Sequence, residues 1–185
     1  MKRIFYKFLF ETLLGWKITG TFDPRIRQCV LMVLPHTSWR DFFVGLFARG
    51  IIKEEMHFVA KNDFFRPPFG WWFRWMGGAP IDRSKSANHV EAIAGMFASR
   101  TVFRVAIAPE GTRRRVNVLR TGFYYIALKA NVPIIPVAFD YGRREVRLGL
   151  PLLPTGNYEA DLKILAETFR NTVGRFPEKS FSFEK

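Results

Sequence analysis

Four short segments of the sequence are almost entirely apolar, and segments with helical spacing separate them. The apolar segments are residues 30–34 (VLMVL), 56–60, 102–108 (VFRVAIA) and 134–139. Strands that are apolar on both faces are typical of parallel sheets covered on both sides. The segments with helical spacing of apolar residues are 39–49, 87–99 and 121–130. This alternation predicts an α/β fold, a single layered domain with a central, mostly parallel sheet flanked by helices.

The remaining segments add detail to this prediction. Residues 146–150 predict an edge strand, and residues 157–173 predict a final helix that Asn157 caps. Residues 66–80 (RPPFGWWFRWMGGAP) form the main irregular stretch, which is typical of a structured lid or an interfacial loop. A chain of 185 residues suits one domain, so we expect residues 1–185 to form a single domain.

The first 20 residues predict an amphipathic helix that contacts either a membrane or the core. Arg3, Lys7 and Glu11 recur every four residues and form one narrow polar stripe, while the rest of the circumference is apolar. The pattern does not decide between an interfacial helix and a helix packed on the core. Glu11 interrupts the apolar stretch that a secretory signal needs, which disfavours that third interpretation. The sequence has no run of about 18 apolar residues, so we expect no spanning helix.

Charge and aromatic content narrow the possible partners. The 29 Lys and Arg residues against 16 Asp and Glu give a net charge of +13, which favours polyanions: nucleic acid, anionic membrane, phosphorylated substrates or an acidic carrier protein. The 20 Phe and 5 Trp residues favour a lipid interface. Cys29 is the single cysteine, which excludes an intrachain disulfide and a cysteine zinc site and suits a reducing compartment.

The first candidate for chemistry is a His-x-x-x-x-Asp pattern, His36 and Asp41, directly after the first predicted strand. The carboxyl edge of an α/β sheet is where such folds place their sites. With His36 in the loop and Asp41 in the first helical turn, the two side chains can meet. A carboxylate on one ring nitrogen leaves the other free to act as a general base. Taken alone, the pair is more typical of an Asp41 helix cap and an ordinary loop histidine.

The second candidate follows the predicted strand 102–108 and comprises Glu110, Gly111, Thr112 and Arg113. Glycine lets backbone N–H groups approach an oxyanion, the threonine hydroxyl donates, and the arginine fork matches phosphate. These residues indicate a phosphate cradle. The alternative is a solvated turn with exposed arginines. Glycine-rich nucleotide-binding patterns are missing, which disfavours ATP and NAD.

Four blocks in this order resemble the glycerolipid acyltransferase family, which includes the 1-acyl-sn-glycerol-3-phosphate acyltransferases. The blocks are His36 to Asp41, Lys61-Asn-Asp63 with residues 77–83 (GGAPIDR), Glu110 to Arg113, and residues 132–136 (VPIIP). The resemblance covers residues 36–136. Arg114 and Arg115 depart from the family, where a small polar residue is common, so the resemblance leaves the acceptor open.

The resemblance implies transfer of a fatty acyl group from acyl-CoA or acyl-carrier protein to the free hydroxyl of a lysophospholipid, with 1-acyl-glycerol-3-phosphate as the expected acceptor. His36 would deprotonate the hydroxyl, Asp41 would orient His36, and no covalent intermediate would form. Arg83 and residues 110–113 would hold the acceptor phosphate. No metal or cofactor is expected, because the thioester donor is itself a substrate.

The expected location is cytoplasmic, on the inner face of a membrane with anionic lipid, and no nucleic-acid partner is expected. The alternative is a basic, non-enzymatic module that binds anionic membrane or nucleic acid. Known nucleic-acid-binding motifs do not occur in the sequence. Ser38 lacks the Gly-x-Ser-x-Gly pattern of a hydrolase nucleophile. We interpret His57 and His89 as structural or surface residues.

Overall fold

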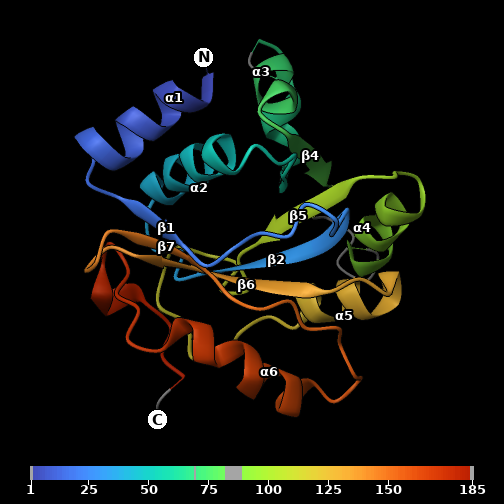
Figure 1. Ribbon diagram of the computed structural model, residues 1–185. Coiled ribbons are helices and arrows are strands. Elements are labelled where there is room, and N and C mark those ends of the chain that lie inside the picture. The colour runs from blue at the N-terminus through green and yellow to red at the C-terminus, as the bar shows by residue number, and fades with distance from the viewer. Residues whose placement is uncertain (1, 69, 82–88, 184–185) are drawn as a thin grey trace.

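A computed structural model describes residues 2–68, 70–81 and 89–183, and its centre is a seven-stranded sheet (Figure 1). The strands are β1 (Lys17–Thr19), β2 (Gln28–Leu34), β3 (His57–Lys61), β4 (Gly78–Ile81), β5 (Phe103–Ile107), β6 (Ile134–Asp140) and β7 (Glu145–Leu148). Their order is β1-β7-β6-β2-β5-β3-β4, and each neighbouring pair is parallel except β6 and β7. The predicted α/β fold is confirmed.

Helices cover both faces of this sheet (Figure 1). The α-helices of the described residues are α1 (Lys2–Lys7), α2 (Arg40–Ile52), α3 (Gly70–Trp75), α4 (His89–Ala98), α5 (Gly122–Ala130) and α6 (Tyr158–Ala166). α2 covers one face of the sheet and α4, α5 and α6 cover the other, while α1 lies over α2. Val30, Met32 and Leu34 of β2 pack in the core cluster under α4, α5 and α6, whereas Cys29 and Leu31 pack in the cluster under α2. Both faces of β2 are therefore buried, which explains why the segment is apolar throughout.

The strand predicted over 146–150 is not at the edge of the sheet. β7 spans Glu145–Leu148 and pairs with β1 on its outer side. The Thr19 hydroxyl donates a hydrogen bond to the Glu145 carboxylate across this pair. β1 has only three residues, too few for a periodic pattern to indicate a strand.

The predicted helix 157–173 is shorter in the structure. The Asn157 cap is confirmed, since its Oδ1 accepts a hydrogen bond from the Ala160 N–H at 3.2 Å. α6 ends at Ala166, and a 3₁₀ turn, Glu167–Phe169, follows. Asn171 then adopts φ 56°, and the Val173 carbonyl accepts from the Tyr141 N–H at 2.8 Å. The helix does not continue to residue 173, because residues 171–173 turn back and bind the backbone next to the end of β6.

The stretch 66–80 is more regular than its composition indicates. It contains α3 and leads into β4, which pairs with β3 at the other edge of the sheet. A β-carbon at Gly70 would lie 2.0 Å from the Phe65 carbonyl oxygen, so only glycine fits there. The predicted helix 87–99 appears as α4 from His89 onward, and residues 87 and 88 lie outside the described residues.

The N-terminal helix predicted over residues 1–20 ends at Leu13. One side of it is buried and the other side is exposed. α1 continues as a π-helical segment, Phe8–Leu13, and the chain then turns into β1. Phe10 is fully buried and packs on Trp16 and Phe47. Exposed apolar side chains on this segment are Ile4, Phe5, Phe8, Leu13 and Leu14. One side of the segment is thus core, and the other is an uncovered apolar surface.

Among the described residues, no helix combines the length and the apolar character that crossing a membrane requires.

Candidate active site

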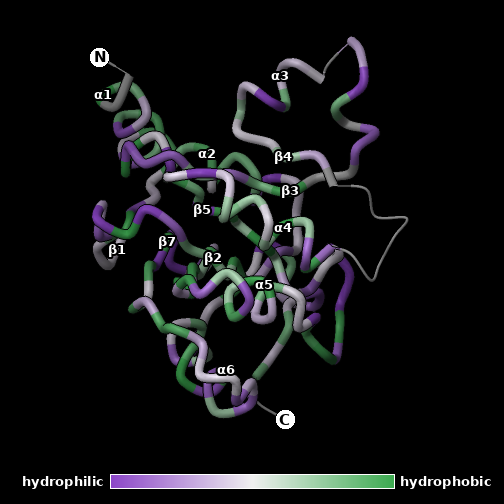
Figure 2. The backbone as a smooth tube through the Cα atoms, turned by 90° about the vertical axis from the view of Figure 1, so that its right-hand side faces the viewer, coloured by the Kyte–Doolittle hydropathy of each residue, from purple (hydrophilic) through white to green (hydrophobic). Residues whose placement is uncertain are grey.

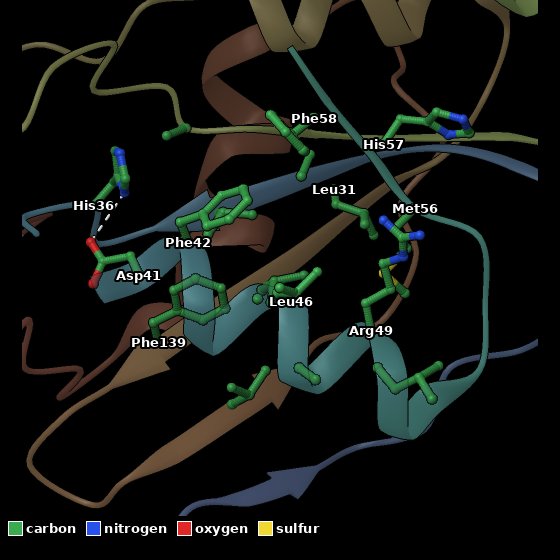
Figure 3. Close-up of a pocket in the computed structure, with 18 of the residues that line it drawn as sticks. Leu31, His36, Asp41, Phe42, Leu46, Arg49, Met56, His57, Phe58 and Phe139 are labelled. Atoms are coloured by element: carbon green, nitrogen blue, oxygen red, sulfur yellow. Dashed lines mark ion pairs between the residues drawn. The ribbon is translucent and has the colours of Figure 1, made fainter. Parts of the chain in front are cut away.

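His36 and Asp41 meet at the carboxyl end of β2, as their spacing predicts. His36 lies in the loop after the strand and Asp41 in the first turn of α2, and His36 Nδ1 is 3.1 Å from Asp41 Oδ2 (Figure 3). The Ser38 N–H donates to the same oxygen at 2.9 Å. Asp41 Oδ2 therefore binds both the backbone just before α2 and the ring of His36. The predicted catalytic role of the pair stays a prediction. With Nδ1 engaged, Nε2 is the nitrogen that can take a proton.

Asp41 is almost completely buried, and its second oxygen is also bound. Only 2 % of the residue is exposed, and the Tyr141 hydroxyl donates to Oδ1 at 2.7 Å. A buried carboxylate whose two oxygens both have hydrogen-bond partners is held in one orientation. The imidazole of His36 is consequently held in one orientation as well.

Glu110 lies beside this pair, with its carboxylate directed at the backbone. It is 1 % exposed, and its two oxygens accept from the His36 N–H at 2.5 Å and the Phe181 N–H at 3.3 Å. Burial raises the pKa of this carboxyl above its usual value. The geometry gives Glu110 a role in holding the His36 loop and the C-terminal segment together. Its predicted role in binding substrate stays a prediction.

The rest of the predicted cradle is on the surface after β5. Gly111 adopts φ +65°, and a β-carbon there would lie 2.6 Å from Nε of Arg120, so the turn requires glycine. Thr112 accepts from the Arg114 N–H at 3.3 Å. Arg113 is exposed and has no ion pair with a residue that the structure describes. The predicted phosphate ligand Arg83 lies outside the described residues.

An apolar cavity of about 260 Å³ begins at His36 and Asp41 and continues between α2 and the sheet (Figure 3). Leu31, Phe42, Leu46, Phe58 and Phe139 form its walls. In Figure 3, His36 and Asp41 lie at one end of the lining residues. Arg49, Met56 and His57 lie at the other end. The site thus places a candidate general base beside an apolar cavity.

The sequence matches the acyltransferase family over residues 18–140. The chain belongs to this family. A 1-acyl-sn-glycerol-3-phosphate acyltransferase of Streptococcus pneumoniae is 30% identical over 148 residues, which cover 74% of this chain and 54% of that protein. The human 1-acyl-sn-glycerol-3-phosphate acyltransferase beta is 34% identical over 129 residues, covering 64% of this chain and 45% of that protein. The chain spans about half the length of these relatives.

A solved structure shares the fold of this chain. It is the 1-acyl-sn-glycerophosphate (LPA) acyltransferase PlsC from Thermotoga maritima, with a TM-score of 0.57 and 19% sequence identity. The match covers 89% of this chain and 74% of that chain. The sheet and its helices are therefore an arrangement already seen in an acyltransferase.

Some residues of the candidate site could not be found in the sequence. The residues of α2 that line the cavity have the same apolar spacing as residues that pack in the core, so the pattern does not separate the two. Tyr141 lies 100 residues from Asp41 along the chain and carries no motif. Burial raises the pKa of the Cys29 thiol to about 12, which keeps it protonated and unreactive. Within the described ranges, no group of three or more His, Cys, Asp or Glu side chains is placed to hold a metal ion.

Proposed function

We propose that this chain is an O-acyltransferase that moves a fatty acyl group from an acyl thioester to the free hydroxyl of a lysophospholipid, 1-acyl-glycerol-3-phosphate by preference. The observation that carries the proposal is the His36–Asp41 pair at one end of an apolar cavity (Figure 3). Membership of the acyltransferase family supports it. The relatives' names supply the acceptor class.

In the proposed reaction, Nε2 of His36 removes the proton of the acceptor hydroxyl as its oxygen attacks the thioester carbonyl. Asp41, which binds Nδ1, stabilises the imidazolium that forms. The C–O bond forms, the C–S bond breaks, and the proton passes from His36 to the departing thiolate. The acyl group goes directly to the acceptor, so no covalent acyl-enzyme forms.

The test is a thioester-consumption assay of the purified protein. It uses a panel of lysophospholipids as acceptors and both acyl-CoA and acyl-carrier protein as donors. Ester formation with at least one lysophospholipid supports the proposal. Thioester hydrolysis without ester product, or no consumption with any pair, would contradict it.

The cavity is the place we propose for the acyl chain. Gly45 of α2 lines it, and a β-carbon there would lie 3.5 Å from Cζ of Phe139, which is ordinary contact. Gly45→Leu is expected to lower kcat/KM for long-chain thioesters about tenfold relative to short ones, because the new side chain occupies the space of several methylenes. Rates with a series of acyl-chain lengths measure this.

Gly95→Leu is the matched control. Gly95 lies on α4, where an added β-carbon meets nothing within 4 Å. This variant should keep the wild-type chain-length preference. An unchanged preference in Gly45→Leu as well would place the acyl chain elsewhere.

Arg113 is the residue we propose for the acceptor phosphate. Arg113→Ala is expected to raise KM for a phosphate-bearing acceptor about tenfold with little change in kcat, because one hydrogen-bonded charge contact is lost. The control is Lys163→Ala, which removes an exposed charge from α6. If KM rises for the thioester donor instead, the Arg113 guanidinium binds the phosphates of the donor. Equal, small effects in both variants would contradict a phosphate-binding role of Arg113.

We further propose that the protein works on the cytoplasmic face of an anionic membrane, with no nucleic-acid partner. Exposed apolar side chains lie on α1 and its π-helical continuation, on α3 and at the start of α2. They include Phe5, Phe8, Trp71, Trp75 and Trp39. α1 and α3 project from the same end of the molecule in both views (Figures 1 and 2). Tryptophan and basic residues favour the boundary between water and lipid, which supports this surface as the membrane contact.

A further inference from the structure

Tyr141 is the residue from which we draw a further inference. It follows β6 directly and lies just beyond the segment that matches the acyltransferase family. Its hydroxyl donates to Asp41 Oδ1 at 2.7 Å, while His36 and the Ser38 N–H bind Oδ2. Each oxygen of the buried carboxylate thus has its own set of partners. Tyr141 is the partner that occupies the oxygen turned away from His36.

The tyrosine ring is itself held from several directions. Its backbone N–H donates to the Val173 carbonyl at 2.8 Å. Trp16 packs edge-on against the ring, with centroids 4.9 Å apart and an interplanar angle of 90°. Trp16 is 8% exposed and packs in turn on Phe10. The hydroxyl therefore has a fixed place, set by segments from both ends of the chain.

The surroundings keep this hydroxyl protonated. Burial, and then the hydrogen bond to Asp41, raise the pKa of Tyr141 far above its usual value, and the nearby Arg175 and Arg40 lower it only in part. The phenol is thus protonated and a hydrogen-bond donor at neutral pH.

We propose that Tyr141 is a positioning residue of the acyl-transfer site, which holds the Asp41 carboxylate so that Oδ2 faces Nδ1 of His36. This inference rests on the proposed function of the His36–Asp41 pair. Without the hydroxyl, Oδ1 loses its donor and the carboxylate can turn to find another. His36 then spends less time in the orientation that accepts the proton, so the rate falls while substrate binding is kept.

The test is Tyr141→Phe, which keeps the ring and its contact with Trp16 and removes the hydroxyl alone. We expect kcat to fall about tenfold, with KM for donor and acceptor within about twofold of wild type. Combining the change with Asp41→Ala should give less than about a twofold further loss, because the acceptor of the hydrogen bond is already gone.

A second tyrosine in the same protein provides the matched control. The Tyr124 hydroxyl donates to Oδ2 of the buried Asp161, also at 2.7 Å, in the layer of α5 and α6. Tyr124→Phe should lower the melting temperature, because Asp161 loses a donor and the Gly156 N–H loses its acceptor, and it should leave kcat unchanged. An equal loss of kcat in both tyrosine variants, or an unchanged kcat in Tyr141→Phe, would overturn the positioning role.

The ring-nitrogen NMR resonances of His36 test the same contact without substrate. They should shift in Tyr141→Phe and stay in place in Tyr124→Phe, and unchanged resonances in Tyr141→Phe would reject the proposal. A protein whose His36 resonances respond in this way but which transfers no acyl group would contradict the proposed function alone.

Discussion

Replacing His36 with alanine is expected to lower kcat by about 10²–10⁴-fold and to leave KM for both substrates nearly unchanged. The loss is the contribution of a positioned general base, and Nε2 is the free nitrogen of the His36–Asp41 pair. Asp41→Asn should also lower kcat, because the neutral amide no longer stabilises the imidazolium. Initial rates of thioester consumption and ester formation measure both effects.

His89→Ala is the control for this prediction. His89 begins α4 and, among the described residues, lies outside the set that lines the cavity at His36, so we expect wild-type rates from this variant. Acyl transfer by His36→Ala at the wild-type rate would show that His36 is not the base.

Two phenylalanines of the N-terminal segment should separate core packing from membrane contact. Phe10 is fully buried, so Phe10→Ala is expected to lower the free energy of unfolding by about 3–5 kcal/mol. Phe8 is 57% exposed, so Phe8→Ser should leave stability unchanged. It should instead weaken binding to anionic lipid vesicles about tenfold, because one aromatic side chain no longer enters the interface.

Denaturant unfolding and vesicle flotation measure the two effects on the same variants. An unchanged unfolding free energy in Phe10→Ala would contradict the packing of this segment on the core. Unchanged vesicle binding in Phe8→Ser would remove the N-terminal segment from the proposed membrane contact. Deleting residues 1–16 cannot separate the two, since the deletion removes Phe10 and Trp16 together with the exposed side chains.

The fold could be predicted because its central strands are buried on both faces. β2, β3, β5 and β6 overlap the four apolar segments of the sequence. The edge strands β1 and β4 and the short helix α3 are not predicted. β1 has only three residues, and β4 and α3 lie in a stretch rich in proline and glycine, which indicates turns and loops. Their formation depends on pairing and packing with segments distant in the sequence.

The site could be predicted only where a local spacing defines it. His36 and Asp41 are five residues apart at the end of a strand, so the sequence alone brings them together. The orientation of Glu110 could not be predicted, because it depends on the backbone of His36 and Phe181, 74 and 71 residues away. Tyr141 reaches Asp41 through the sheet topology, which no motif records.

The walls of the cavity also belong to the core of the protein. Leu31, Val137, Phe139 and Val146 line the cavity and are members of the core cluster between α2 and the sheet. A bound acyl chain would complete this cluster, so occupancy would raise the free energy of unfolding by linkage. Under the proposed function, product release would reopen a gap in the core, and interactions that stabilise the occupied state would slow the return to the empty state.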